Sequence, residues 1–393
     1  MPTADAPIRP PQRFSNNMDT KSRLTLAEGR LLTQLADPEA PAPEPDTMLQ
    51  HLIASQPGAD PLATALPVDL AKAAQSEVRG GPKQWRALPR LIHAADAHAV
   101  LPIVARKLAA VGLCPELLPE PTQSLLHRHR QQHHIAIGQA MLLNHHASTI
   151  AEQFKKHKVD AIIVKGPRFA SQLYDQPGDR TYTDIDFLVA PEAVNRANNL
   201  ISQLGFSRPQ KFWDNARRDQ EYKWLLDENV SVLVEIHGNL VHYPALRRRV
   251  SLGYRELAAI GGVDPGNPVA NLMIAVIHCA CGHKFHRLNL LLDVLQAVRR
   301  LERKDDQVLT AAVSELGAEL ETGVTLGVVG TLFRCPRTLT LAEHFSHHWA
   351  TRVGRKLISP DAVFAAPIPG SIDSRIRRHA FRRLQELGLA RIG

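Results

Sequence analysis

The sequence has little cysteine and no long apolar run. Four Cys among 393 residues exclude a disulfide-stapled scaffold and fit a reducing compartment, so we expect a cytoplasmic protein. No apolar stretch approaches the roughly 18 residues that indicate a membrane span. The first residues also lack the continuous apolar segment of a secretory signal. We therefore expect no membrane partner.

Aromatic residues are also scarce, at 5% of the chain, whereas Lys and Arg outnumber Asp and Glu by 47 to 39, for a net charge of +8. A basic balance suggests polyanionic partners, and arginines gather at 247–249 and within 375–383. Because no aromatic residues are interleaved with them, base stacking is poorly supported and a nucleic-acid partner is not favoured. The 44% of hydrophobic residues is ordinary for a globular protein and excludes a wholly disordered chain.

The length predicts two to three domains, and local composition divides the chain into four regions. Residues 1–45 are Pro-rich and indicate a mostly disordered tail, with one short amphipathic helix in RLTLAEGRLLTQLA. Residues 46–158 have the apolar spacing of an N-terminal helical region. Residues 159–255 predict a small core that contains strands, and residues 256–393 a C-terminal helical region.

The core region combines short apolar runs with two helices, in the order β-α-β-α-β-β. The helices are expected at 168–174 and 191–205, and a hairpin turn at Glu228-Asn229. The expected strands are 159–164 (VDAIIV), 183–189 (TDIDFLV), 221–227 (EYKWLLD) and 230–238 (VSVLVEIHG). The predicted fold class is therefore α+β, a small mixed β-sheet with helices between N- and C-terminal helical regions.

Three carboxylates are the most informative side chains of this core. Asp184 and Asp186 lie two residues apart in one strand, so they share a face. Neighbouring carboxylates repel unless a cation neutralises them, and Mg²⁺ prefers carboxylates together with substrate phosphates. Glu235 is an acid on another alternating strand. If the two strands are neighbours, the three carboxylates suit phosphoryl transfer with two metals, and one can accept the proton of an attacking hydroxyl.

Basic residues precede these carboxylates. Lys165-Gly166 stands where a strand meets a helix: glycine permits close backbone approach, a helix N-terminus favours anions and lysine supplies positive charge. Arg180, four residues before Asp184, has two open interpretations, because it can neutralise a triphosphate or pair with a carboxylate. His237 and His242 flank Glu235 and are interpreted as substrate contacts or as hydrogen-bond partners of the acids.

The pattern VKGPRFASQLYDQPGDRTYTDIDFLV, followed by LVEIH, resembles the polymerase-β-type nucleotidyltransferase superfamily. More narrowly, it resembles an uncharacterised bacterial nucleotidyltransferase family with the signature K-G…Y…R…D-[IL]-D-[FL]-L-V. The resemblance is specific across 159–240 and extends loosely to His283 and Asp293 in the following helices. Two positions depart from the superfamily: Lys165-Gly166-Pro167 replaces its Gly-Ser pair, and Glu235 replaces its commoner Asp.

The resemblance implies a nucleotidyltransferase that binds Mg²⁺ or Mn²⁺ and a nucleoside triphosphate, for which we expect ATP. The implied metal-binding and catalytic residues are Asp184, Asp186 and Glu235. The implied nucleotide-binding residues are Lys165, Gly166, Arg180 and His283. The reaction would transfer a nucleoside monophosphate to a hydroxyl of a small molecule, peptide or protein and release pyrophosphate. Two alternatives stay open: a non-catalytic nucleotide-binding or regulatory module, and a nucleotidyltransferase that acts on RNA.

Two histidine-rich runs look like metal sites at first sight. The run from His278 to His286 contains Cys279-Ala280-Cys281, but zinc sites usually space their cysteines by about two to four residues. The run also lies in an apolar helical pattern, where Cys behaves as a small hydrophobe. The histidines from His127 to His134 lack acidic or Cys neighbours. We expect no metal at either run and expect His283 to face the active cleft.

Overall fold

The computed structural model describes most of the chain from residue 24 onward. Among the sequence predictions, the first part of the tail, residues 46–86 and the turn at Glu228-Asn229 lie outside the described residues. No helix among the described residues is long and apolar enough to cross a membrane. The described residues are 24, 26–42, 87–110, 120, 122–176, 178–209, 221–227, 231–347, 349–365 and 372–387.

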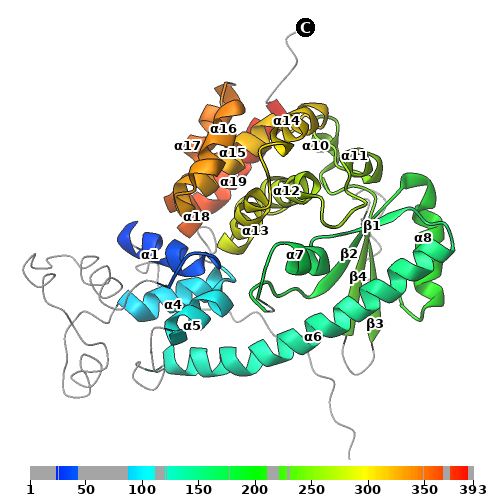
Figure 1. The fold of residues 1–393 in the computed structure, drawn as a ribbon, viewed down its shortest axis with the longest axis horizontal. Helices are drawn as coiled ribbons and strands as arrows, with labels where there is room; N and C mark the ends of the chain where they lie inside the picture. The colour runs from blue at the N-terminus through cyan, green and yellow to red at the C-terminus, as the bar shows by residue number, and fades with distance from the viewer. Residues whose placement is uncertain are drawn as a thin grey trace, which may run out of the picture.

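A four-stranded mixed sheet forms the centre of the core region, in the order β1-β2-β4-β3 (Figure 1). The strands are β1 (Ala161–Val164), β2 (Asp184–Val189), β3 (Glu221–Asp227) and β4 (Ser231–His237). Strand β1 pairs antiparallel with β2, β2 pairs parallel with β4, and β4 pairs antiparallel with β3. The four strands and the α+β class predicted from the sequence are confirmed.

Alternation along the strands gives the sheet two different faces. Ile185, Phe187 and Val189 of β2 pack in one hydrophobic core with Phe154 of helix α6 (Thr122–Lys156) and Ile201 of α8 (Val194–Gln203). The opposite face of β2 carries Asp184, Asp186 and the buried Leu188, which belongs to the core built by the other helices. Figure 1 shows α6 running from α5 to the sheet and α8.

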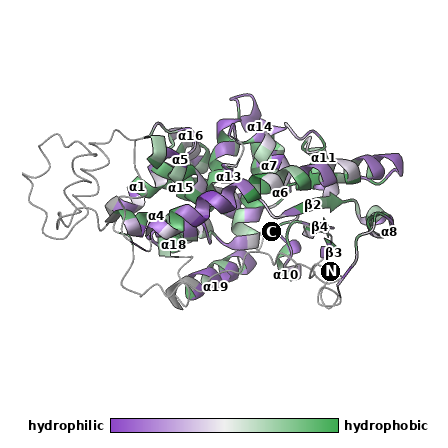
Figure 2. Cartoon of the chain, turned by 90° about the horizontal axis from the view of Figure 1, so that it is seen from below, coloured by the Kyte–Doolittle hydropathy of each residue, from purple (hydrophilic) through white to green (hydrophobic). Residues whose placement is uncertain are grey.

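The helices on the carboxylate-bearing side form one continuous core with the N-terminal helices. Helices α7 (Gly166–Gln172), α12 (Pro268–Ile277) and α13 (Leu288–Arg299) share this core with α4 (Ala87–Ala97) and α5 (Leu101–Ala110). The C-terminal helices complete this core. In Figure 2, hydrophilic and hydrophobic residues alternate along these helices. The remaining helices are α10 (Pro244–Arg247), α11 (Tyr254–Ala259), α14 (Asp305–Glu315), α15 (Glu319–Phe333), α16 (Pro336–His344), α17 (Trp349–Leu357), α18 (Pro360–Ala365) and α19 (Ile372–Leu387), with a 3₁₀ turn at Pro191–Ala193 and a π-helix at His278–His283.

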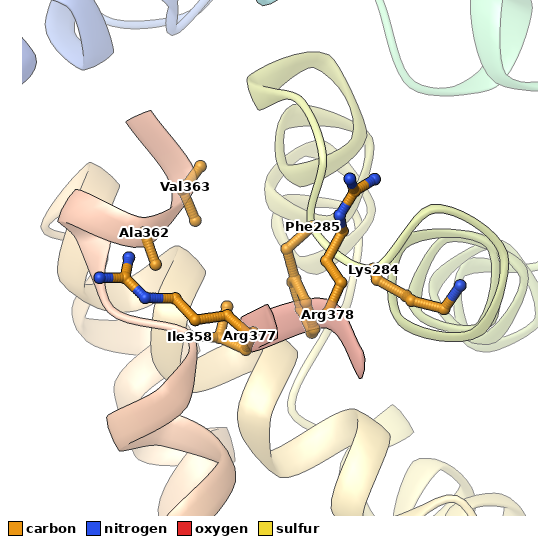
Figure 3. A pocket seen from close by; sticks show the side chains of 7 residues that line it. All are labelled: Lys284, Phe285, Ile358, Ala362, Val363, Arg377 and Arg378. Carbon is orange, nitrogen blue, oxygen red and sulfur yellow. The ribbon is translucent and has the colours of Figure 1, made fainter. Parts of the chain in front are cut away.

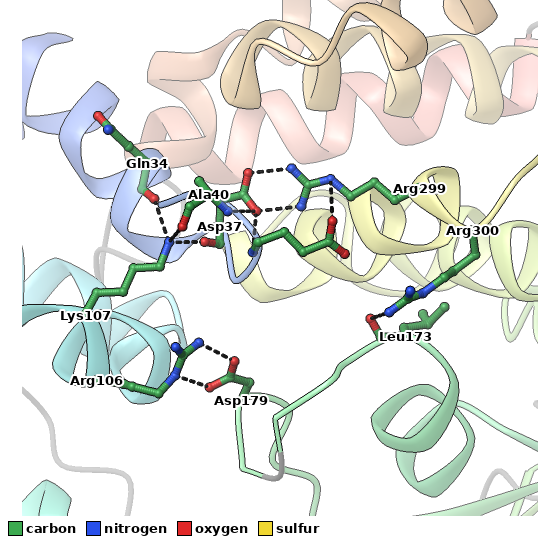
Figure 4. Close-up of polar contacts among 10 residues, drawn as sticks. Gln34, Asp37, Ala40, Arg106, Lys107, Leu173, Asp179, Arg299 and Arg300 are labelled. Atoms are coloured by element: carbon green, nitrogen blue, oxygen red, sulfur yellow. Dashed lines mark hydrogen bonds and ion pairs between the residues drawn. The ribbon is translucent and has the colours of Figure 1, made fainter. Parts of the chain in front are cut away.

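The short amphipathic helix expected near the N-terminus is α1 (Leu26–Ala36), and it is part of the main core. Three leucines of α1 are at most 2% exposed, so this portion of the proline-rich segment is folded rather than a tail. The residues after α1 are held by polar contacts. The carboxylate of Asp37 accepts hydrogen bonds from both Nη atoms of Arg299, at 2.6 and 2.7 Å (Figure 4). Lys107 of α5 donates to the carbonyl oxygens of Gln34, Asp37 and Ala40.

Candidate active site

Strand register brings two of the three predicted carboxylates together. Asp186 of β2 lies directly opposite Glu235 of the parallel neighbour β4. Because adjacent strands are about 4.8 Å apart and opposite residues share a face, both side chains point to the same side of the sheet. Both are buried, at 2% and 7% exposure. Two acids at this depth require positive partners, because an unpaired buried charge is costly.

His237, two residues after Glu235 on the same face, is one of these partners. Its Nε2 lies 2.8 Å from Oδ1 of Asp186 and 3.4 Å from Oε2 of Glu235. Burial alone lowers the pKa of His237, but its hydrogen bonds to Asp186 and Glu235 outweigh burial and raise the pKa to about 9. In the absence of another cation, the imidazole is therefore protonated at neutral pH between the two carboxylates.

Lys165 is the second partner, and it reaches the site from the end of β1. Val164, the last residue of β1, pairs with Asp186 in the sheet, so Lys165 directly after it lies next to this carboxylate. The Nζ of Lys165 lies 2.7 Å from Oδ1 of Asp186. Burial raises the pKa of Asp186, but the charge of Lys165 and the hydrogen bond from His237 together lower it below its usual range. The same pairing raises the pKa of Lys165 against the opposing effect of burial.

The backbone at Lys165-Gly166 has an unusual conformation. Both residues have positive φ angles, 56° and 27°, a region that residues with a side chain rarely adopt. A Cβ at Gly166 would lie 3.1 Å from the carbonyl oxygen of Asp184. Gly166 therefore permits the close approach of this turn to β2, and the turn directs Lys165 toward the carboxylates.

Strand β3 adds residues that the sequence analysis missed. Lys223 lies opposite Glu235 and contacts its Oε1, and its Nζ is 2.5 Å from Oε1 of Glu221. Nδ1 of His242, after β4, lies 2.7 Å from Oε2 of Glu221. The alternation of Glu221 and Lys223 in EYKWLLD was a visible signal, but its meaning depended on the register with β4.

Two sets of side chains have the composition of a cation site. Asp186, Glu235 and His237 form one set, and Glu221, His237 and His242 form the other, each with ligand atoms within 4.8 Å of one another. Asp184 belongs to neither set among the described residues. It shares the face of Asp186, and burial, followed by repulsion from Asp186 and Glu235, raises its pKa to about 6.

Arg180 is held by a helix of the C-terminal region. It forms a bidentate pair with Asp293 of α13, with Nε–Oδ1 and Nη2–Oδ2 distances of 2.8 and 3.0 Å. The hydroxyl of Tyr174 donates to the same Asp293 at 2.8 Å. Of the two interpretations of Arg180, the carboxylate pair is the one present here. Arg180 also acts electrostatically on Asp184, since its positive charge opposes the rise in the pKa of that carboxyl.

His283 lies at the end of the π-helix His278–His283, with its ring centroid 4.7 Å from that of His278. Burial and then the positive charge of Lys165 lower the pKa of His283 to about 4. The imidazole is therefore neutral and within electrostatic range of the lysine. Cys279 and Cys281 of the same run are buried thiols, and burial raises both pKa values.

Comparison with known proteins identifies the family of the chain. The model of a family described as an uncharacterised nucleotidyltransferase matches residues 84–334, well over half of the chain. No curated protein and no solved structure matches the chain. The matched region contains the sheet, the carboxylates, Lys165 and the Arg180–Asp293 pair. The chain is therefore a member of this nucleotidyltransferase family and a transferase that uses a nucleoside triphosphate.

Proposed function

We propose that this protein transfers a nucleoside monophosphate from a nucleoside triphosphate, with ATP expected, to a hydroxyl group, and that it needs a divalent cation. The observation that carries the proposal is the register that sets Asp186 opposite Glu235 on adjacent strands, on the same face as Asp184. The acceptor hydroxyl oxygen bonds to the α-phosphorus, the bond from that phosphorus to the oxygen that bridges to the β-phosphorus breaks, and pyrophosphate leaves. The hydroxyl proton passes to a carboxylate, for which Glu235 is the candidate.

The donor set fits a divalent cation. Asp186, Glu235 and His237 are buried and place their ligand atoms within 4.8 Å of one another. Carboxylate oxygens suit Mg²⁺ and Mn²⁺, and an added imidazole is compatible with Mn²⁺. Asp186 and Glu235 would hold the cation, and Asp184 would join them from the same face. When bound, such a cation supplies positive charge that stabilises the phosphates during transfer.

The phosphates have basic candidates nearby. Lys165 now neutralises Asp186, and it would turn toward the phosphates when another cation neutralises that carboxylate. Gly166 lets the backbone approach closely. Arg180 would act mainly as a positioning residue, because Asp293 accepts hydrogen bonds from its Nε and Nη2 and the carbonyl of Thr181 accepts one from its Nη1. His283 is neutral and therefore available as a hydrogen-bonding group toward the nucleotide.

A transfer assay tests the proposal. The protein is incubated with host lysate, Mg²⁺ or Mn²⁺, and each nucleoside triphosphate radiolabelled at the α-phosphate, which is the phosphate that stays on the acceptor. The variant Asp186→Asn removes a ligand charge, and Asp175→Asn is the matched control, because Asp175 is 72% exposed and pairs only at the surface with Arg300. We expect Asp186→Asn to lose roughly a hundredfold or more in labelling, since even groups behind metal ligands are worth about 10- to 100-fold. Equal labelling by both variants would contradict the assignment, and no labelling by wild type would favour a regulatory nucleotide-binding module.

RNA is a second candidate acceptor because of one basic cluster. Lys284, Arg377 and Arg378 surround a small apolar pocket (Figure 3). Burial and then the charges of Arg382 and Arg378 lower the pKa of Lys284, as expected for a like-charge cluster. The guanidinium of Arg382 stacks on the ring of Tyr243, 4.2 Å from the ring centroid. Tyr243 directly follows His242 of the candidate site in the sequence. Ribonuclease treatment of the lysate before the assay distinguishes the acceptor classes. Loss of the label would show that the acceptor is RNA, and persistence of the label would show that it is a small molecule, peptide or protein.

A further inference from the structure

Strand β1 is an edge of the sheet. It pairs with β2 on one side, and no described strand pairs with its other side. The amide of Ala190 donates to the carbonyl of Asp160, so residues 160, 162 and 164 direct their backbone groups toward β2. By the alternation of an antiparallel pair, the backbone groups of Ala161 and Ile163 point away from the sheet. The guanidinium of Arg168 lies 3.5 Å from the carbonyl of Ile163, and the other three groups have no hydrogen bond within the described part of the chain.

A groove of about 660 Å³ follows this edge. All four residues from Asp160 to Ile163 line it, which means that the strand edge itself forms the floor. One wall is the end of α6, with Ala151 and Phe154, and the other is α7 and the segment around Val263. Val263 is 60% exposed at this rim and offers an apolar contact there.

The groove has a marked charge bias. Asp160 is the single acidic side chain that lines it, whereas Lys155, Lys158 and Arg168 supply three positive charges. Lys155 and Lys158 make no ion pair with any described residue. A ligand complementary to this groove has three properties. It carries backbone hydrogen-bond donors and acceptors at the spacing of a strand, apolar side chains that contact the walls, and negative charge on the side that faces α6.

We propose that the β1 edge binds an extended, acidic segment of a partner polypeptide as a fifth strand of the sheet. Strand addition satisfies the outward groups of Ala161 and Ile163, as in other complexes formed at sheet edges. Strand β1 has four residues, about 13 Å at roughly 3.3 Å per residue, so the bound segment is of similar length. Binding of this segment at β1 does not depend on the nucleotide transfer proposed above. It places the partner one strand away from Asp186, beside the strand that immediately precedes Lys165.

A peptide probe tests strand addition directly. The probe is an N-acetylated hexapeptide amide of alternating glutamate and valine, and binding to the full chain is followed by fluorescence polarisation and hydrogen exchange. We expect slower exchange of the amides of Ala161 and Ile163. In an added strand, alternate amides face β1. Two methylated peptides should therefore differ in affinity, one with all valine amides N-methylated and one with all glutamate amides N-methylated. We expect one of them to lose binding and the other to bind like the unmodified probe. Equal effects of the two sets, or no binding at millimolar peptide, would overturn the proposal.

Two protein variants complete the test. Lys155→Glu/Lys158→Glu reverses charges that line the groove, and Lys156→Glu is the matched control, because Lys156 is exposed on α6 and does not line it. Ile163→Pro removes one outward amide and leaves the β1–β2 bonds in place, so we expect roughly two- to tenfold weaker peptide binding, the effect of one hydrogen bond. The charge variant should weaken binding at low salt and the control should not. Unchanged affinity in both test variants, with unfolding transitions like that of wild type, contradicts docking at this edge.

Discussion

At the scale of single residues, Gly166 is restricted by both its backbone conformation and its contact with β2. Its φ is 27°, and a Cβ added there would lie 3.1 Å from the backbone of Asp184, so alanine does not fit without movement of β2. We expect Gly166→Ala to lower the free energy of unfolding by about 1–3 kcal/mol, the usual cost of a residue held in a disfavoured region. Urea unfolding measures this change.

Gly138 is the matched control for that substitution. It lies in α6 with nothing within 4 Å of an added Cβ. Gly138→Ala should raise the free energy of unfolding by about 0.5–1 kcal/mol, because alanine is the better helix former. If both substitutions changed stability in the same direction, the conformational argument at Gly166 would be wrong.

At the scale of elements, one ion pair ties the residue that follows α1 to α13. Arg299 of α13 holds Asp37, which is 5% exposed, with two short hydrogen bonds. Arg299→Ala leaves this carboxylate buried without its partner, and we expect a loss of roughly 2 kcal/mol, less than for a fully buried pair because Arg299 is 24% exposed. Hydrogen exchange of the α1 amides should accelerate.

The neighbouring Arg300 provides the comparison for Arg299. It pairs with Asp175, which is 72% exposed, so Arg300→Ala should change stability by no more than about 0.5 kcal/mol. Figure 4 shows Arg299 at the end of α13 and Arg300 directly after it. Equal exchange rates of α1 in the two variants would show that Arg299 does not anchor this helix.

The elements also show how far sequence reasoning reaches. Alternation in TDIDFLV and SVLVEIH predicted both strands and the side on which their acids lie, because side-chain direction follows from local backbone geometry. The contribution of Glu221 and Lys223 could not be predicted, since it depends on the register of β3. The partner of Arg180 is 113 residues away, and such a pairing follows from tertiary packing. The folding of α1 likewise depends on apolar contacts with distant helices.

At the scale of the whole molecule, we expect a buried histidine to make the stability of the fold sensitive to acid. Nδ1 of His98 accepts a hydrogen bond from the amide of Leu288, which joins the turn after α4 to α13. Burial lowers the pKa of His98 from 6.5 to about 3. Between these values the unfolded chain binds a proton that the folded chain does not, so stability falls as the pH drops below 6.5.

His98→Asn keeps an acceptor near the same position and removes this titration. The slope of unfolding free energy against pH should therefore become shallower, by up to about 1.4 kcal/mol per pH unit between roughly pH 6 and pH 4. Urea unfolding of both proteins across this range measures the slopes. Parallel curves would assign the acid sensitivity to other groups.

The Arg180–Asp293 pair has a consequence for how the molecule moves. It joins the chain just before the carboxylate strand to α13, and Tyr174 adds a third hydrogen bond to the same acid. A hinge that separated the sheet from α13 would have to break all three bonds and expose a carboxylate that is 1% exposed. We therefore expect the sheet and α13 to stay joined while nucleotide enters and product leaves. Movement during turnover would then be confined to side chains and short loops, without a hinge between the sheet and α13.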